Sequence, residues 1–161
     1  MRKSIIAILM TFCLSIMTYA QTPRDRATEL KEQAQSSLNQ KDYIKARYLF
    51  KKAYEAFATR ENYPQAIECG VQANALYVRE NFYKEGFELC RDMEQLLWTG
   101  EQNKKKVFYD LRFLINKERL QMYTALKNPA QAKTQLDKLE EMANLAKNDS
   151  LTEVLLYTKA N

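Results

Sequence analysis

The sequence predicts an all-α protein in which consecutive helices pack as antiparallel hairpins. Only three glycines and three prolines occur in 161 residues, so few positions interrupt a helix. Apolar side chains recur at intervals of three and four residues, without strand-like alternation. A short phrase also recurs with its tyrosines 20 residues apart, which is the length of one helix and one tight turn. Its three copies are Asp42-Tyr43-x-x-Ala46, Asn62-Tyr63-x-x-Ala66 and Phe82-Tyr83-x-x-Gly86.

The apolar spacing and the turn residues together set the expected helix boundaries. Asn62, Asn81 and Asn128 are expected to cap the helices that follow them, because a short polar side chain can accept a free backbone N–H. Trp98-Thr99-Gly100 is expected to end a helix, with Trp98 packed under the turn or, alternatively, exposed as a binding anchor. The predicted helices are 24–39, 42–58, 62–79, 82–97, 102–127, 129–147 and 150–160.

The first 20 residues have the layout of a secretory signal peptide. Arg2 and Lys3 precede an apolar run over 5–17, and small residues lie three and one before a cut after Ala20. An uncleaved anchor is disfavoured by four hydroxyl side chains within this segment, and a lipoprotein signal by Phe12 before Cys13. The sequence therefore predicts export, with residues 21–161 as one periplasmic or other extracytoplasmic domain.

The charge of the exported part argues against nucleic-acid binding. Without Arg2 and Lys3 the chain carries 23 basic and 20 acidic residues, a net charge of +3. This mixed balance lacks the basic footprint that a nucleic-acid binder needs. The one dense cluster, 104–106, is all lysine, and is expected to be a solvated face at an unfavourable helix start rather than an anion site.

Several chemistries are missing from the sequence. The chain has no histidine, which removes histidine-based catalysis and histidine metal ligands, and its scattered glycines form no phosphate-binding loop. Cys69 and Cys90 cannot hold a metal by themselves; on neighbouring antiparallel helices they form either a disulfide or two buried thiols. Carboxylate pairs such as Glu88 with Asp92 have the spacing of an ordinary exposed helix face. We therefore expect no enzyme activity and no cofactor in this segment.

Residues 24–161 resemble the tetratricopeptide repeat, a helix-turn-helix in which small side chains let paired helices approach closely. The best match is Tyr43-x-x-Ala46-x-x-x-Phe50-x-x-Ala53, with Ala34 on the preceding helix. Two further pairs match through Tyr77, Tyr83, Gly86, Cys90 and Met93, and through Leu120, Tyr123, Ala132, Leu136 and Leu139. The resemblance implies a right-handed superhelix of about three helical hairpins plus one unpaired helix.

The sequence also departs from the family pattern. The large aromatic residue expected early in each repeat is replaced by Leu30, Gly70 and Asn116, and the spacing between pairs is 40 and then 46 residues. The helix 102–127 would be about 39 Å long at about 1.5 Å per residue. The last helix lacks a partner and a polar cap, so we expect the chain to continue in a longer protein or to self-associate.

The resemblance implies a partner-binding site on the concave face of the first helices. Carrying the family's groove positions onto this sequence gives polar residues of mixed charge, suited to a peptide or protein partner, although solvated helices also expose such residues. These positions are Lys31, Gln35, Asn39, Glu68, Arg79, Lys117, Gln121 and Thr124.

Two functions remain open at this point. In the first, the chain is the extracytoplasmic interaction or sensor region of a bacterial membrane regulator, because signal sequences followed by irregular repeats resemble the front of envelope sensor histidine kinases; a kinase output domain would then lie beyond residue 161. In the second, it is a self-contained secreted periplasmic adaptor, which the lack of a second hydrophobic segment favours.

Overall fold

The computed structural model describes residues 25–160 and confirms the all-α prediction. Within that range it contains seven helices and no strand. The predicted signal peptide, 1–20, lies outside the described residues. The helices are α2 (Arg26–Asn39), α3 (Tyr43–Thr59), α4 (Tyr63–Arg79), α5 (Tyr83–Lys104), α6 (Tyr109–Ala125), α7 (Pro129–Ala146) and α8 (Asp149–Ala160).

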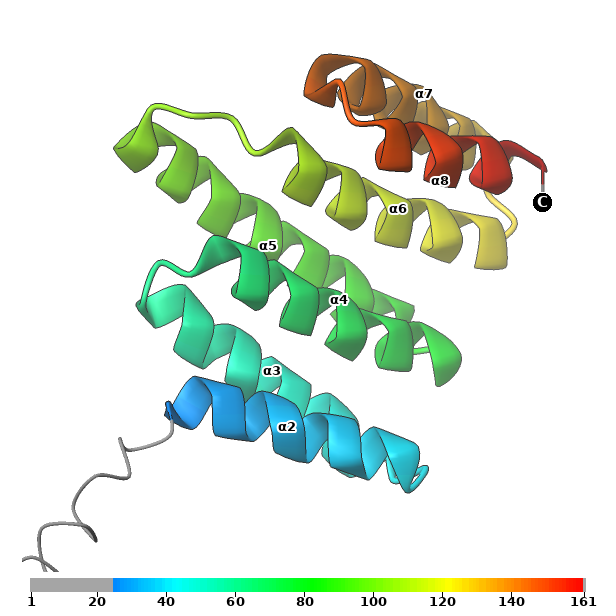
Figure 1. The fold of residues 1–161 in the computed structure, drawn as a ribbon. Helices are drawn as coiled ribbons and strands as arrows, with labels where there is room; N and C mark the ends of the chain where they lie inside the picture. The colour runs from blue at the N-terminus through cyan, green and yellow to red at the C-terminus, as the bar shows by residue number, and fades with distance from the viewer. Residues whose placement is uncertain (1–24, 161) are drawn as a thin grey trace, which may run out of the picture.

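The helices are arranged in two layers (Figure 1). Each helix packs against the next one in sequence, and α4 also contacts α6. In the view of Figure 1, α2, α4, α6 and α8 lie nearer to the viewer, and α3, α5 and α7 lie behind them. Polar contacts between alternate helices support this reading, because Lys31 of α2 reaches Glu68 of α4 and Asn74 of α4 reaches Glu118 of α6.

Four connections between helices share one backbone geometry, which explains the repeated phrase. The residue before each N-cap has a positive φ; these residues are Lys41, Glu61, Asn81 and Lys127. At the first of them, the N–H groups of Lys41 and Asp42 donate to the carbonyls of Leu38 and Ser37. This is a Schellman motif, which satisfies the last carbonyls of one helix while its final residue caps the next helix. The phrase therefore encodes a turn and the first residue of a helix.

The same geometry corrects the prediction that Asn81 is an N-cap. Asp42, Asn62 and Asn128 do cap their helices, accepting the N–H of the residue three positions later. Asn81 instead occupies the left-handed position, and Phe82 is the N-cap without a side-chain hydrogen bond. Asn tolerates the left-handed conformation better than most residues, which accounts for this placement.

The largest error in the predicted boundaries lies between α5 and α6. Helix α5 continues through Gly100 to Lys104, and α6 begins at Tyr109, so the long helix 102–127 does not form. A Cβ at Gly100 would lie 2.5 Å from Cζ of Tyr63, so the glycine lets α5 pass close to that ring and does not end the helix. Lys104 therefore lies at a helix C-terminus, where the macrodipole favours a cation.

Trp98 corrects a second prediction in this stretch. Its side chain is 55% exposed on α5 and does not pack under a turn. The structure therefore supports the alternative that Trp98 is exposed. The role of Trp98 as a binding anchor stays a prediction.

The buried apolar residues form two cores that meet at α6. The larger one is built by α2–α5 with Ile115 and Met122 of α6. The smaller one joins Phe113 and Leu120 of α6 to buried residues of α7 and α8. Helix α6 thus offers one side to each core and positions α7 and α8 relative to the rest of the chain.

Candidate ligand-binding groove

A groove with a volume of about 800 Å³ runs between α6 and α8. Both helices belong to the nearer layer of Figure 1, and α7 lies behind them. Helix α6 contributes Lys117, Leu120, Gln121, Thr124 and Ala125, helix α7 contributes Leu136, and helix α8 contributes Glu153, Val154, Tyr157, Thr158 and Lys159.

The groove combines apolar side chains with polar groups along its edges. Leu120, Leu136 and Val154 are buried or half-buried and belong to the smaller core, so the lining is continuous with the packed interior. Tyr157 of α8 is 74% exposed and presents an aromatic ring at the groove. Such a lining, mostly apolar with a few polar groups, is the composition expected of a ligand site.

The charged residues of the groove differ in whether an ion pair within the protein neutralises their charge. Lys159 Nζ lies 3.0 Å from Glu140 Oε1, which neutralises that end. Lys117 on α6 is half-buried, Glu153 on α8 is exposed, and neither forms an ion pair with a residue in the described range. A ligand lying between α6 and α8 would therefore meet one cation and one anion that have no partner among residues 25–160.

Three of the predicted partner-binding residues lie in this groove, namely Lys117, Gln121 and Thr124. They occupy one face of α6, as their spacing of three and four residues requires. The other five predicted residues lie on α2 and α4 and do not contribute to it.

The predicted residues on α2 and α4 are engaged within the protein. Lys31 Nζ lies 2.7 Å from Glu68 Oε2 and donates to Gln65 Oε1 at 2.9 Å. Gln35 Nε2 donates to Asn39 Oδ1 at 3.1 Å. The contacts of Lys31 hold α2 to α4, whereas the Gln35–Asn39 bond lies within α2, and both leave fewer polar groups for a ligand.

Arg79 is engaged by an aromatic ring. Its guanidinium carbon lies 3.8 Å from the centroid of the Tyr43 ring. This cation–π contact joins the last residue of α4 to the first residue of α3. The structure therefore separates the eight predicted residues into a paired group of five and a groove group of three.

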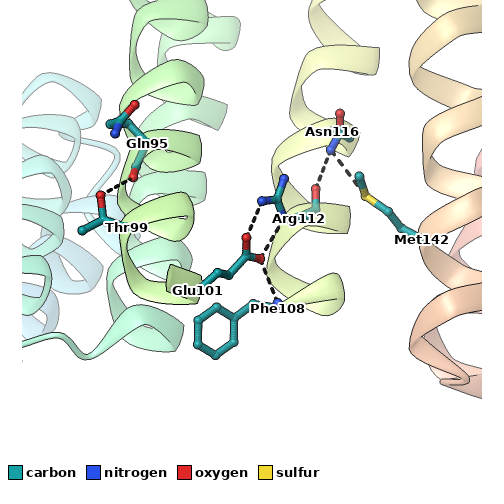
Figure 2. Close-up of polar contacts among 7 residues, drawn as sticks. All are labelled: Gln95, Thr99, Glu101, Phe108, Arg112, Asn116 and Met142. Atoms are coloured by element: carbon teal, nitrogen blue, oxygen red, sulfur yellow. Dashed lines mark hydrogen bonds and ion pairs between the residues drawn. The ribbon is translucent and has the colours of Figure 1, made fainter. Parts of the chain in front are cut away.

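A partly buried ion pair fixes the start of α6, which forms one wall of the groove (Figure 2). Glu101 at the end of α5 accepts hydrogen bonds from Nε of Arg112 at 2.8 Å and from the backbone N–H of Phe108 at 2.9 Å, and its other oxygen pairs with Nη2 of Arg112. Hydrogen bonding from Arg112 lowers the pKa of Glu101 below its usual value, so the carboxylate stays charged. The connection between α5 and α6 is thereby held in place.

A further polar contact ties α6 to α7. The amide nitrogen of Asn116 donates to the backbone carbonyl of Arg112 at 2.8 Å and lies 3.5 Å from the sulfur of Met142 (Figure 2). Asn116 occupies a position where the repeat pattern expects a large aromatic residue. Its amide instead bridges a helix carbonyl and a methionine of the neighbouring helix.

A buried amide–acid pair lies where α4 contacts α6. Asn74 Nδ2 donates to Glu118 Oε2 at 2.9 Å, and both side chains are almost fully buried. Burial raises the pKa of Glu118, because removing a carboxylate from water disfavours its charged form. The Oδ1 atom of Asn74 has no hydrogen-bond partner in the described structure.

Cys69 and Cys90 are buried free thiols and form no disulfide with each other in the structure. Burial raises the pKa of Cys69 to about 11 and that of Cys90 to about 12. A thiol with such a pKa is a poor nucleophile at neutral pH. Both residues therefore act as small apolar side chains of the larger core.

Residues 25–160 contain no group of three or more acidic or cysteine side chains placed to hold a metal ion. Within the same range, each helix is too short or too polar to cross a membrane.

A second, smaller hollow lies on the other layer. It has a volume of about 390 Å³ and is bordered by α3 and Tyr77 at the end of α4. Its lining is mainly basic and aromatic and includes Ile44, Arg47, Tyr48, Lys51 and Lys52.

Sequence reasoning missed the contribution of α7 and α8 to the groove. The sequence places Leu136 in the repeat pattern, but it predicts no ligand role for Leu136, Val154 or Tyr157. Helical spacing shows which face of α8 is apolar, but it does not show that this face lies across from Lys117 and Gln121. Finding the groove required the packing of α8 beside α6.

Comparison with known protein families, with curated proteins and with solved structures finds no match for this chain. Its functional interpretation therefore depends on the geometry of its own residues.

Proposed function

We propose that this chain is a protein-interaction module of the tetratricopeptide type, which binds a peptide or protein partner in the groove between α6 and α8. The single observation that carries the proposal is this groove of about 800 Å³, with its apolar lining and its two uncompensated charges, Lys117 and Glu153. An apolar side chain of a partner would occupy the space between Leu120 and Val154. Its acidic and basic groups would pair with Lys117 and Glu153.

The repeat pattern supports the finer fold proposal. Helices α3 and α5 bury most of the same positions at a spacing of 40 residues, with Ala46 and Ala53 matched by Gly86 and Met93. We accordingly propose a solenoid of three hairpins, α2–α3, α4–α5 and α6–α7, followed by α8, with a right-handed superhelical twist. In this arrangement α2, α4, α6 and α8 line the inner, concave face.

We further propose that the module is the extracytoplasmic sensor region of a bacterial signal-transduction protein. The signal-like segment 1–20 followed by irregular repeats supports this proposal. The second candidate is a self-contained secreted periplasmic adaptor, favoured by the absence of another long apolar segment after residue 20. Determining the coding sequence beyond Asn161 distinguishes the two: a membrane span with an output domain supports the sensor, and a stop codon supports the adaptor.

Partner binding is tested by selecting peptides from a displayed random library on the protein beginning at Gln21. Selected peptides should lose at least about tenfold in affinity with Tyr157→Ala or Lys117→Ala, because each removes one group of the groove. Tyr157 and Lys117 are not fully buried, so the fold should tolerate both changes. Lys31→Ala is the matched control, since Lys31 is already paired within the protein.

Two results would contradict the proposed function. One is a selection that yields no binding peptide, and the other is a set of peptides that bind all three variants as well as the wild type.

A further inference from the structure

Helix α3 carries an unusual outward face. Ile44 is 69% exposed and Tyr48, one turn later, is 60% exposed. The guanidinium carbon of Arg47 lies 4.9 Å from the ring centroid of Tyr77 and 5.1 Å from that of Phe82, which is itself partly exposed. Helix α3 therefore carries large apolar side chains on its outward face in addition to those, such as Phe50 and Phe57, that it buries in the core.

Basic side chains surround these apolar residues. Helical spacing places Lys45, Lys51 and Lys52 on the same side of α3 as Tyr48. Lys52 is already engaged, with its Nζ 2.8 Å from Glu55 Oε2. Lys45 and Lys51, together with Lys41 in the preceding turn, form no ion pair with any residue in the described range. The face thus has three uncompensated positive charges beside two exposed apolar side chains.

Helix α5 provides an internal control, because its positions correspond to those of α3 after a shift of 40 residues. The buried residues correspond, with Leu49 matched by Leu89. The outward residues do not correspond, since Ile44 is matched by Lys84 and Tyr48 by Glu88. Lys45 and Lys52 are likewise matched by acidic residues, Glu85 and Asp92. The packing of the repeat therefore requires neither the apolar residues nor the basic excess of α3.

We propose that this face of α3 binds an anionic membrane surface. Lysines near an anionic bilayer each contribute about 1 kcal/mol, and their long stems let the charge reach the headgroups while apolar neighbours enter the interface. Tyrosine is suited to that interface because its ring is apolar and its hydroxyl is polar. Ile44 and Tyr48 are each more than half exposed between lysines of α3, so both side chains can enter the interface of an anionic bilayer.

This proposal is independent of ligand binding between α6 and α8. Helix α3 lies in the farther layer of Figure 1, whereas the groove opens in the layer that contains α6 and α8. Membrane association through α3 would leave the groove accessible, so either proposal can fail without the other.

The test is co-sedimentation with lipid vesicles, using the protein that begins at Gln21. Residues 1–20 are removed because their apolar run would itself bind lipid; both cores and all the described helices lie within 25–160 and are retained. Circular dichroism first verifies that each variant is helical. We expect binding to vesicles containing phosphatidylglycerol and none to pure phosphatidylcholine. This binding should disappear at about 1 M salt, where the screening length is about 3 Å.

Variants then assign the binding to α3. Lys45→Gln with Lys51→Gln should weaken binding about 30-fold, which corresponds to two lysines at about 1 kcal/mol each. Ile44→Ser with Tyr48→Ser should weaken it about tenfold through the loss of apolar insertion. The control, Lys84→Gln with Arg91→Gln, removes the same charge from α5 and should leave binding unchanged.

Three outcomes would overturn the proposal. Equal binding to uncharged vesicles would remove the electrostatic basis, and an equal loss in the α5 control would show that net charge alone is responsible. Binding of poly-glutamate without binding of anionic vesicles would show that the face recognises an acidic protein.

Discussion

Helices α2–α5 and helices α6–α8 present similar polar side chains along one layer of the molecule, and the groove of about 800 Å³ lies in the second region. In the first region Lys31 forms an ion pair with Glu68, and Arg79 forms a cation–π contact with the ring of Tyr43. In the second region Lys117 and Glu153 lack such partners among the described residues. The position of a polar residue in the repeat therefore does not by itself show that it can bind a ligand. Its side chain is available only where no neighbouring helix already supplies a partner for it.

The two regions also differ in their cores. The first core contains most of the buried apolar residues and extends over five helices, whereas the second is formed mainly by Phe113, Leu120, Leu139, Ala143 and Leu155. A small core gives few apolar contacts to stabilise α7 and α8. We expect this region to open locally more often than the first.

The largest predicted effect tests whether the second core is a separate unit. Leu139→Ala removes a fully buried side chain of that core and should cost about 2–5 kcal/mol. Native-state hydrogen exchange should show that amide protection falls in α7 and α8 and stays almost unchanged in α3. Leu97→Ala, at an equally buried position in the first core, is the matched control and should reduce protection in α4 and α5. A uniform loss throughout the chain in the Leu139 variant would mean that the molecule unfolds as one unit.

The second prediction concerns the joint between the regions, where Glu118 of α6 meets Asn74 of α4. Burial raises the pKa of Glu118, so the folded state retains the proton at pH values where the unfolded chain has lost it. The stability of the wild type should therefore fall as the pH rises from about 4.5, the ordinary value, through the raised pKa of the folded state.

Glu118→Gln should remove this part of the pH dependence. Its amide accepts from Asn74 Nδ2 and offers a donor to Asn74 Oδ1, which has no partner in the described structure. Urea unfolding at about pH 5 and about pH 8 should show the variant gaining stability relative to the wild type at the higher pH. Glu88→Gln on the exposed face of α5 is the control. Parallel pH profiles of wild type and Glu118→Gln would contradict the assignment.

The sequence predicts the helices well where a local signal exists. The phrase around Tyr43 and Tyr63 contains both a turn and an N-cap, and the observed helix starts lie within one residue of the expected ones. The signal fails at Gly100, because a glycine that ends a helix and one that lies against a ring look alike in sequence. The difference depends on Tyr63, which is 37 residues away.

The candidate site was only partly predictable for a related reason. Periodicity places Lys117, Gln121 and Thr124 on one face of α6, and this local inference agrees with the groove lining. The pairing of Lys31 with Glu68 connects residues that are 37 positions apart, and the opposite wall of the groove comes from α8. Helical spacing carries no information on which helix lies across from which.

The smallest predicted effect tests a feature that the two regions share. Lys41 follows the C-cap of α2 and Lys127 follows the C-cap of α6, both with a positive φ in the same Schellman motif. A non-glycine residue in the left-handed region costs about 1–2 kcal/mol, and part of this would be offset by the greater freedom of glycine in the unfolded chain. Lys41→Gly and Lys127→Gly should each raise the free energy of unfolding by about 0.5–1 kcal/mol, measured by urea titration.

The matched control for these substitutions is Lys45→Gly, which places the same change inside α3 and should instead cost about 1 kcal/mol. Opposite signs at Lys41 and Lys45 would establish that the turn geometry, and not the loss of a lysine, determines the effect. Equal gains at Lys41 and Lys127 would show that the turns are energetically equivalent in both regions. The difference between the regions would then lie in their cores and in the packing of α8. A gain at Lys41 alone would instead show that the second region opens at its turns, before its core is lost.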